Sequence, residues 1–345
     1  MLDLQRLEMG WEDSSRVTRG HFEESTHRVL EAVFRQLHNP KLPLVSVDCV
    51  VALEVPLHMP LAFEPMKLRG FLTVATIGGF LVLADVVQRL IIVPLAWAGP
   101  ARKDRVFAVW LRGLASAIIG GVRSVGGGKF APLPTIPFAP GVLVLMNHQS
   151  LLDIPIVVQC VEGGYLRIVT RKRYARGVPA ISRLIKLYDF PLVDPTGGMR
   201  EQVKVLREAA RDPRVPIVVY PEGTRSRDGE LLPFRRGAVD TLLRHRQWKV
   251  YLATADGTLP CGRLKDMLNG VQMVDCRVNV SGPFDTPTDP KDFRFWLEEM
   301  EGRMRKDLTE LRSPAAVSNR TPETHGVETS RAEASKAEPV TERPE

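Results

Sequence analysis

The sequence has little of what identifies several common classes of protein. It contains four cysteines among 345 residues, and they form neither a CxxC pair nor a cluster with histidine, which argues against a zinc site and a disulfide scaffold. Aromatic residues make up 7% of the chain and no nucleic-acid-binding motif occurs, although the net charge of +7 allows an anionic partner. No G-x-S-x-G elbow is present, and the glycines before Lys129 lack the spacing of a nucleotide-binding loop. We therefore expect no metal, no nucleic-acid partner and no serine-hydrolase chemistry.

The N-terminal region also lacks the continuous apolar core of a cleavable secretory signal. Together with the absence of cysteine pairs, this indicates a reduced, cytosolic environment for the globular part of the protein. Residues 1–66 contain an amphipathic pattern near 21–37 and a strand-like stretch near 42–63. Neither pattern indicates a function.

Two apolar runs follow, at 70–84 and 90–99, on either side of a short polar segment. At about 1.5 Å per residue the first run covers roughly 22 Å, less than the ~30 Å of a bilayer core. Joined into one span, they would put Asp85 and Arg89 near the middle of the bilayer. Basic residues on both flanks place both ends on the cytoplasmic side, so the pattern favours a re-entrant or monotopic hairpin of two short helices that dip into the membrane.

The alternative is a buried helix pair of a soluble domain, in which Asp85 and Arg89 form an i,i+4 ion pair. An amphipathic helix is predicted at 106–125. Residues 67–126 are thus expected to be membrane-associated helices at the cytoplasmic face of the cell membrane.

Strand-like and helix-like patterns alternate from 127 to 313, which predicts an α/β domain with a mixed sheet flanked by helices. The tail 314–345 has no aromatic residue, Leu, Ile or Met, and is predicted to be disordered. The expected strands are 142–146, 166–170, 216–220, 250–254 and 271–280, and the expected helices are 151–161, 199–210, 238–245 and 291–311.

The sequence NHQSLLD comes directly after the first of these strands. His148 and Asp153 would lie roughly 140° apart on a regular helix, so the histidine must precede the helix for the two side chains to meet. An acid in the first helical turn can then orient the imidazole, which accepts a proton from an alcohol near neutral pH. The alternative is a helix N-terminus, because Ser150 and Asp153 have the spacing of a capping box.

A second apolar strand ends in the sequence YPEGTRS, which includes residues 222–225. Glycine lets backbone N–H groups face an anion, threonine adds a hydroxyl, and arginine offers a planar fork for phosphate oxygens. Arg235 and Arg236 then precede a helix, whose N-terminus also favours anions. The alternative is a charged loop without a ligand.

NHQSLLD, together with YPEGTRS and PFRRGA, resembles the glycerolipid acyltransferases typified by 1-acyl-sn-glycerol-3-phosphate acyltransferase, over about 142–256. The resemblance implies a membrane enzyme of phospholipid biosynthesis that moves a fatty acyl group from acyl-CoA or acyl carrier protein to a glycerol hydroxyl, without a further cofactor. It implies that His148 is the base and Asp153 its orienting acid. The substrate-binding residues expected from it are Glu222, Gly223, Thr224, Arg225 and Lys172.

Lys172 lies in the segment 167–186, which has seven Lys or Arg residues and no Asp or Glu. This segment is either a surface for anionic lipid or CoA phosphates, or a solvated helix face.

The sequence departs from the family pattern between the two motifs. Related proteins usually have an apolar stretch ending in Asp-Arg, whereas Pro195 stands here where the arginine would fall. Arg200 or the cluster at 171–173 is a candidate to replace it. The acceptor is thus a phosphorylated lysolipid, or alternatively a lysophosphodiester or a neutral alcohol. A non-enzymatic lipid-binding scaffold is the third interpretation, and the intact His148 and Asp153 argue against it. The oligomeric state is left open.

Overall fold

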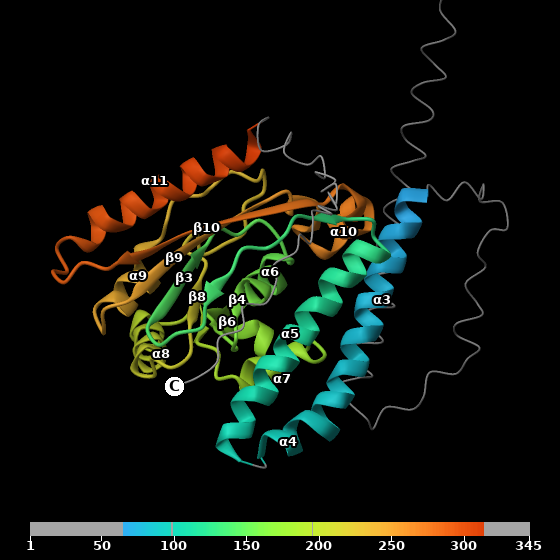
Figure 1. The fold of residues 1–345 in the computed structure, drawn as a ribbon, viewed down its shortest axis with the longest axis horizontal. Coiled ribbons are helices and arrows are strands. Elements are labelled where there is room, and N and C mark those ends of the chain that lie inside the picture. The colour runs from blue at the N-terminus through green and yellow to red at the C-terminus, as the bar shows by residue number, and fades with distance from the viewer. Residues whose placement is uncertain (1–64, 98, 195, 314–345) are drawn as a thin grey trace, which may run out of the picture. The chain divides into compact units, whose positions relative to one another are not determined.

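The computed structural model describes residues 65–97, 99–194 and 196–313, all within one compact unit (Figure 1). The expectations for residues 1–64, for Pro195 and for the tail 314–345 concern positions outside the described residues. The helices are α3 (Pro65–Val87), α4 (Val93–Trp97), α5 (Pro100–Ser124), α6 (Asp153–Cys160), α7 (Ile181–Leu187), α8 (Met199–Arg211), α9 (Arg236–Leu243), α10 (Leu264–Gly270) and α11 (Phe293–Arg312), with short helical turns η1 (Gln88–Ile92), η2 (Lys172–Ala175), η3 (Leu259–Cys261) and η4 (Val271–Met273).

A six-stranded sheet forms the centre of the domain, in the order β1-β10-β9-β3-β8-β5. Strands β9, β3, β8 and β5 are parallel, β10 runs antiparallel to β9, and β1 is parallel to β10. The predicted mixed sheet is confirmed. The strands are β1 (Lys129–Phe130), β2 (Ile136–Pro137), β3 (Val142–Met146), β4 (Val161–Glu162), β5 (Arg167–Ile168), β6 (Thr170–Arg171), β7 (Leu192–Val193), β8 (Ile217–Val219), β9 (Lys249–Asp256) and β10 (Asp275–Asp285).

Strand β3 is buried on both faces, which explains its unbroken apolar sequence. Val144 packs into a core shared with α5, α6 and α7, while Leu143 and Leu145 pack into a second core shared with α8, α9 and α11. Because β3 and its two neighbours are parallel, their carboxyl ends meet at one edge of the sheet. The prediction of a strand at 271–280 is correct only in its second part, since Val271–Met273 is a helical turn.

The apolar N-terminal helices form a hairpin, as predicted, but its two arms are not the apolar runs 70–84 and 90–99. Helical backbone continues from α3 through the π-helical turn η1 into α4, and α5 returns beside α3 (Figure 1). Both apolar runs therefore belong to one continuous helical stretch, and the prediction that they form two separate short helices is wrong. The two side chains form an ion pair of 2.7 Å, and the Asp85 carboxylate also accepts the backbone N–H of Ala180 at 3.1 Å. Asp85 thus fastens the hairpin to the beginning of α7.

Two helical stretches, Lys67–Trp97 and Arg102–Ser124, are long and apolar enough to cross a membrane by length and composition. Only 17% of the apolar window of the first stretch is buried within the protein, which argues against the buried helix pair of a soluble domain. Within this first stretch, the large apolar side chains that are exposed are Leu68, Phe71, Leu72, Val82, Leu83, Val86, Leu90, Ile91, Leu95 and Trp97.

Gly70 lies where α3 crosses α10, and an added Cβ there would overlap the carbonyl oxygen of Leu268. A Cβ at Gly78 in the same helix meets nothing within 4 Å. We expect Gly70→Ala to lower the free energy of unfolding by about 1–3 kcal/mol, and Gly78→Ala to leave it unchanged or raise it by roughly 0.5–1 kcal/mol. Thermal unfolding of both variants, followed by circular dichroism under identical conditions, measures the difference. Equal midpoints would contradict the close crossing.

Candidate active site

Strand β3 ends at Met146, and the side chain of the next residue, Asn147, forms the following pair of hydrogen bonds to β9 in place of the backbone. The Asn147 amide nitrogen donates to the carbonyl oxygen of Ala255 at 2.8 Å, and the Asn147 amide oxygen accepts the backbone N–H of Ala255 at 2.7 Å. The buried side chain therefore imitates one more ladder residue against β9. It fixes the point at which His148 leaves the sheet.

His148 and Asp153 meet as the sequence predicts. The distance from Nδ1 of His148 to Oδ2 of Asp153 is 2.8 Å, and the carboxylate is fully buried. A buried carboxylate needs several donors to offset the loss of water. Asp153 accepts the backbone N–H groups of Gln149 and Ser150, each at 2.7 Å, and the hydroxyls of Ser150 at 3.1 Å and Thr258 at 3.0 Å.

Only one half of the capping box forms. The Asp153 carboxylate accepts the backbone N–H of Ser150 as in a capping box, but Asp153 is itself the first residue of α6. The Ser150 hydroxyl donates to Asp153 and accepts the backbone N–H of Leu152, so it closes the turn instead of capping the helix. Thr258 was not found from the sequence, since it lies 105 residues from Asp153 in the loop after β9 and no local pattern marks it.

Glu222, in the second motif, forms a hydrogen bond to the turn that contains His148. One carboxylate oxygen accepts the backbone N–H of His148 at 2.6 Å and the other accepts that of Leu232 at 2.9 Å. The backbone N–H of Ser226 donates to the carbonyl oxygen of His148 at 2.8 Å. Burial raises the pKa of Glu222 to about 7, although the two backbone hydrogen bonds act in the opposite direction. Glu222 thus connects the two motifs through their backbones.

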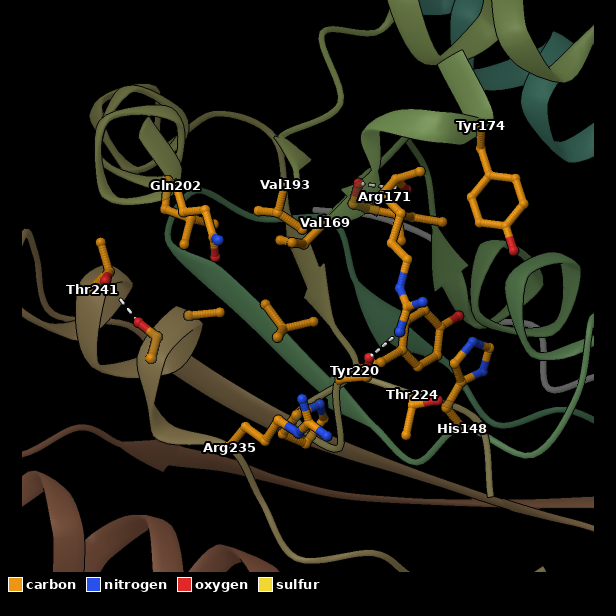
Figure 2. Close-up of a pocket in the computed structure, with 18 of the residues that line it drawn as sticks. His148, Val169, Arg171, Tyr174, Val193, Gln202, Tyr220, Thr224, Arg235 and Thr241 are labelled. Carbon is orange, nitrogen blue, oxygen red and sulfur yellow. Dashed lines mark hydrogen bonds between the residues drawn. The ribbon is translucent and has the colours of Figure 1, made fainter. Parts of the chain in front are cut away.

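A pocket of about 490 Å³ opens beside His148 between the sheet, α8 and α9 (Figure 2). Apolar side chains line its interior, among them Ile168, Val169, Val193, Val203, Leu206 and Val219. Gly223, Thr224 and Arg225 line it as expected, together with Arg171, Arg173 and Arg235. None of the described residues that line it carries a carboxylate. An anionic group therefore meets only neutral or positive side chains there.

The arginines come from three separate parts of the chain. Arg171 in β6 donates from Nη2 to the carbonyl oxygen of Gly223 at 2.8 Å, and Arg225 donates to the carbonyl oxygen of Gly262. Gly223 has a φ of +68°, which glycine adopts without steric cost, and so the loop turns sharply between β8 and Thr224. Arg235 is exposed, and its guanidinium forms no hydrogen bond or ion pair within the described part of the chain.

Three other sequence candidates do not line the pocket. Lys172 is exposed and pairs with Glu201 at 3.5 Å, and neither it nor Arg200 lines the pocket. The side chain of Glu222 does not line the pocket either. Of the candidates to replace the missing arginine, the pocket contains Arg171 and Arg173.

Known proteins share both this fold and this site sequence. The α/β fold and the paired motifs place the chain in the class of acyltransferase domains, and the sequence model of the family described as Acyltransferase matches residues 131–255. The chain is 32% identical over 170 residues to the 1-acyl-sn-glycerol-3-phosphate acyltransferase of Helicobacter pylori, in an alignment that covers 48% of this chain and 67% of that protein. The chain therefore belongs to the 1-acyl-sn-glycerol-3-phosphate acyltransferase family, which confirms the resemblance found in the sequence.

A plant relative and a solved structure agree with this assignment. The 1-acyl-sn-glycerol-3-phosphate acyltransferase of Cocos nucifera is 27% identical over 132 residues, which cover 37% of this chain and 40% of that protein. The match therefore spans less than half the length of the coconut relative. The crystal structure of the 1-acyl-sn-glycerophosphate acyltransferase PlsC from Thermotoga maritima superimposes with a TM-score of 0.55 and 18% identity, covering 72% of this chain and 98% of that one. At this identity the superposition shows a shared fold.

The raised pKa of Glu222 predicts a pH-dependent stability. The folded protein binds this proton more tightly than an ordinary glutamate, whose pKa is 4.5, so the stabilising contribution is complete below that pH and is lost as the pH rises through about 7. We expect the unfolding free energy of the wild type, minus that of Glu222→Gln, to fall by roughly 1–3 kcal/mol between about pH 5 and about pH 8. Chemical denaturation at both pH values measures it.

The control for this prediction is Glu208→Gln, which changes an exposed carboxylate on α8. The corresponding difference for Glu208 should stay nearly constant with pH. A constant difference for Glu222 as well would contradict the effect of burial on its pKa.

Proposed function

We propose that this protein transfers a fatty acyl group from a thioester donor, acyl-CoA or acyl-acyl carrier protein, to the hydroxyl of a lysophosphatidic-acid-like glycerolipid in phospholipid biosynthesis. The observation that carries the proposal is the His148–Asp153 pair at the edge of a pocket that combines an apolar interior with arginines and has no carboxylate lining. The related proteins named above carry this activity in their names.

The geometry supports general-base catalysis by His148. Because Nδ1 is engaged by Asp153, and Nε2 has no partner among the described residues, Nε2 is the nitrogen available to a substrate. It takes the proton from the acceptor hydroxyl while the hydroxyl oxygen attacks the thioester carbonyl carbon. The C–O bond forms, the C–S bond breaks, and the imidazolium returns the proton to the leaving thiolate. Asp153 stabilises the imidazolium and holds the ring in the required tautomer.

The two parts of the pocket suit the two parts of the substrates. The apolar interior formed by β5, β8 and α8 suits an acyl chain, since it removes methylene groups from water. The arginine-lined part suits a phosphate, because guanidinium groups bind phosphate oxygens in a bidentate fashion. We favour a phosphorylated acceptor because Arg171, Arg225 and Arg235 converge there, although the family arginine is replaced by Pro195.

The apolar helical hairpin supports action at a membrane. Exposed apolar side chains on α3 and α4 suit insertion into lipid, and the basic residues on both flanks favour the cytoplasmic face. The hairpin is fastened to α7 through Asp85, so insertion would keep the α/β domain close to the lipid surface. A lysolipid acceptor resides at that surface.

The proposal predicts that His148→Ala abolishes acyl transfer. The purified protein is incubated with labelled acyl-CoA or acyl-acyl carrier protein and a panel of lysolipids, and the products are identified by mass. Loss of a general base should lower kcat by about 10²- to 10⁴-fold. The unfolding midpoint should also fall, because the buried Asp153 carboxylate loses one donor, so kcat is measured at a temperature at which the variant is folded. His245→Ala, at an exposed histidine that does not line the pocket, is the matched control. Unchanged turnover in His148→Ala would refute the mechanism.

The acceptor is tested at two adjacent arginines. Arg235 lines the pocket, whereas Arg236 does not and pairs with Asp240 at 3.1 Å. Arg235→Gln should raise the KM for lysophosphatidic acid about tenfold or more, because a charge-assisted hydrogen bond is lost, and should leave the KM of the donor nearly unchanged. Arg236→Gln should change neither constant. A wild-type preference for lysophosphatidylglycerol over lysophosphatidic acid would instead favour an acceptor without a phosphomonoester.

A further inference from the structure

The face of the His148 imidazole is covered by an aromatic ring. The ring of Tyr220, which directly follows β8, stacks on it with centroids 4.2 Å apart and an interplanar angle of 24°. Figure 2 shows the two rings side by side at the edge of the pocket. No local sequence pattern indicates this contact, since 72 residues separate the two positions.

The stack restrains a motion that the hydrogen bond to Asp153 leaves free. The bond of 2.8 Å fixes Nδ1, but the imidazole can still tilt about the line that joins Cβ to Nδ1. A nearly parallel ring at van der Waals distance blocks that tilt on one side. Because Nε2 lies across the ring from this line, its position depends most on the tilt. Small displacements of a reacting group are costly in rate.

The aromatic ring, rather than the phenolic hydroxyl, is the part of Tyr220 that the site uses. The hydroxyl oxygen is buried and has no hydrogen-bond partner within the described residues, so it contributes nothing to the orientation of His148. Burial raises the pKa of Tyr220 well above its ordinary value, so the phenol is also unsuited to proton transfer. The π face, in contrast, is well placed to stabilise the imidazolium that forms when His148 takes a proton.

We infer that Tyr220 is a positioning residue for His148: its ring holds the imidazole in the plane from which Nε2 reaches the acceptor hydroxyl. This inference rests on the proposed acyltransferase function for its kinetic consequences. Its structural part, the restraint on the imidazole, is independent of the substrate.

A pair of variants separates the ring from the hydroxyl. Tyr220→Phe keeps the ring and should retain kcat within about twofold, with an unfolding midpoint at least as high as that of the wild type. Tyr220→Leu removes the ring and should lower kcat by about 10- to 100-fold while both KM values change less than about threefold. If the leucine variant does not fold, Tyr220→Met, whose flexible side chain fills irregular space, takes its place.

Tyr165→Leu is the matched control for the loss of a tyrosine ring. Tyr165 is half-buried and packs edge-on against Phe107 and Tyr188, and it does not line the pocket. Its removal should lower the unfolding midpoint and leave kcat unchanged. A fall in kcat equal to that of Tyr220→Leu would attribute the effect to general destabilisation and overturn the inference.

A spectroscopic measurement tests the restraint without any substrate. In protein labelled with ¹⁵N-histidine, the proton between His148 and Asp153 is assigned by its absence in His148→Ala. Its resonance should persist in Tyr220→Phe and broaden or shift in Tyr220→Leu. An unchanged resonance in Tyr220→Leu would overturn the inference. If the wild-type protein transfers acyl groups, a kcat of Tyr220→Leu equal to that of the wild type would overturn it as well. A wild-type protein that acylates no lysolipid would contradict the proposed function, and the resonance would still decide the role of Tyr220.

Discussion

The buried carboxylate of Asp153 is the constraint on which the site depends. A charge without contact with solvent must be surrounded by donors, and the five that surround it come from the His148 imidazole, two backbone N–H groups and two hydroxyls. Four of these groups belong to the turn between β3 and α6, so the carboxylate restrains the conformation of that turn. The fifth, from Thr258, ties that turn to the loop after β9.

Parallel strands bring the remaining parts to the same place. The carboxyl ends of β3, β8 and β9 lie side by side, and each is tied to the next by a side chain that bonds to backbone: Asn147 to Ala255, and Glu222 to His148. Arg312 at the end of α11 extends this network, because it pairs with Asp256 at 3.1 Å and donates to the carbonyl oxygen of Gly229 at 2.7 Å. His148 is thus held by backbone geometry as much as by its own side chain.

Arginines and apolar side chains are concentrated in three separate parts of the structure. Arginines gather on one side of the pocket, apolar side chains line its interior, and the exposed apolar surface of α3 and α4 lies outside it. A charged side chain, Asp85, joins the hairpin to the domain within an otherwise apolar segment. The N–H of Ala180 and the guanidinium of Arg89 offset part of the cost of burying this carboxylate.

Local patterns in the sequence were sufficient to predict much of the fold and the contact between His148 and Asp153. An apolar run followed by Asn-His predicted β3 to the residue, and the five-residue spacing predicted that His148 and Asp153 meet ahead of α6, because hydrophobic periodicity and helix geometry act over a few residues. Tertiary structure alone decided that Thr258 donates to the Asp153 carboxylate and that Tyr220 covers the His148 imidazole. It also decided that Arg171 and Arg235 line the pocket while Lys172 pairs with Glu201. The continuation of the helix through Asp85 was likewise visible only in the structure. These contacts join positions far apart in the chain, or depend on which neighbour a side chain meets, and only the packing of the sheet and its helices determines both.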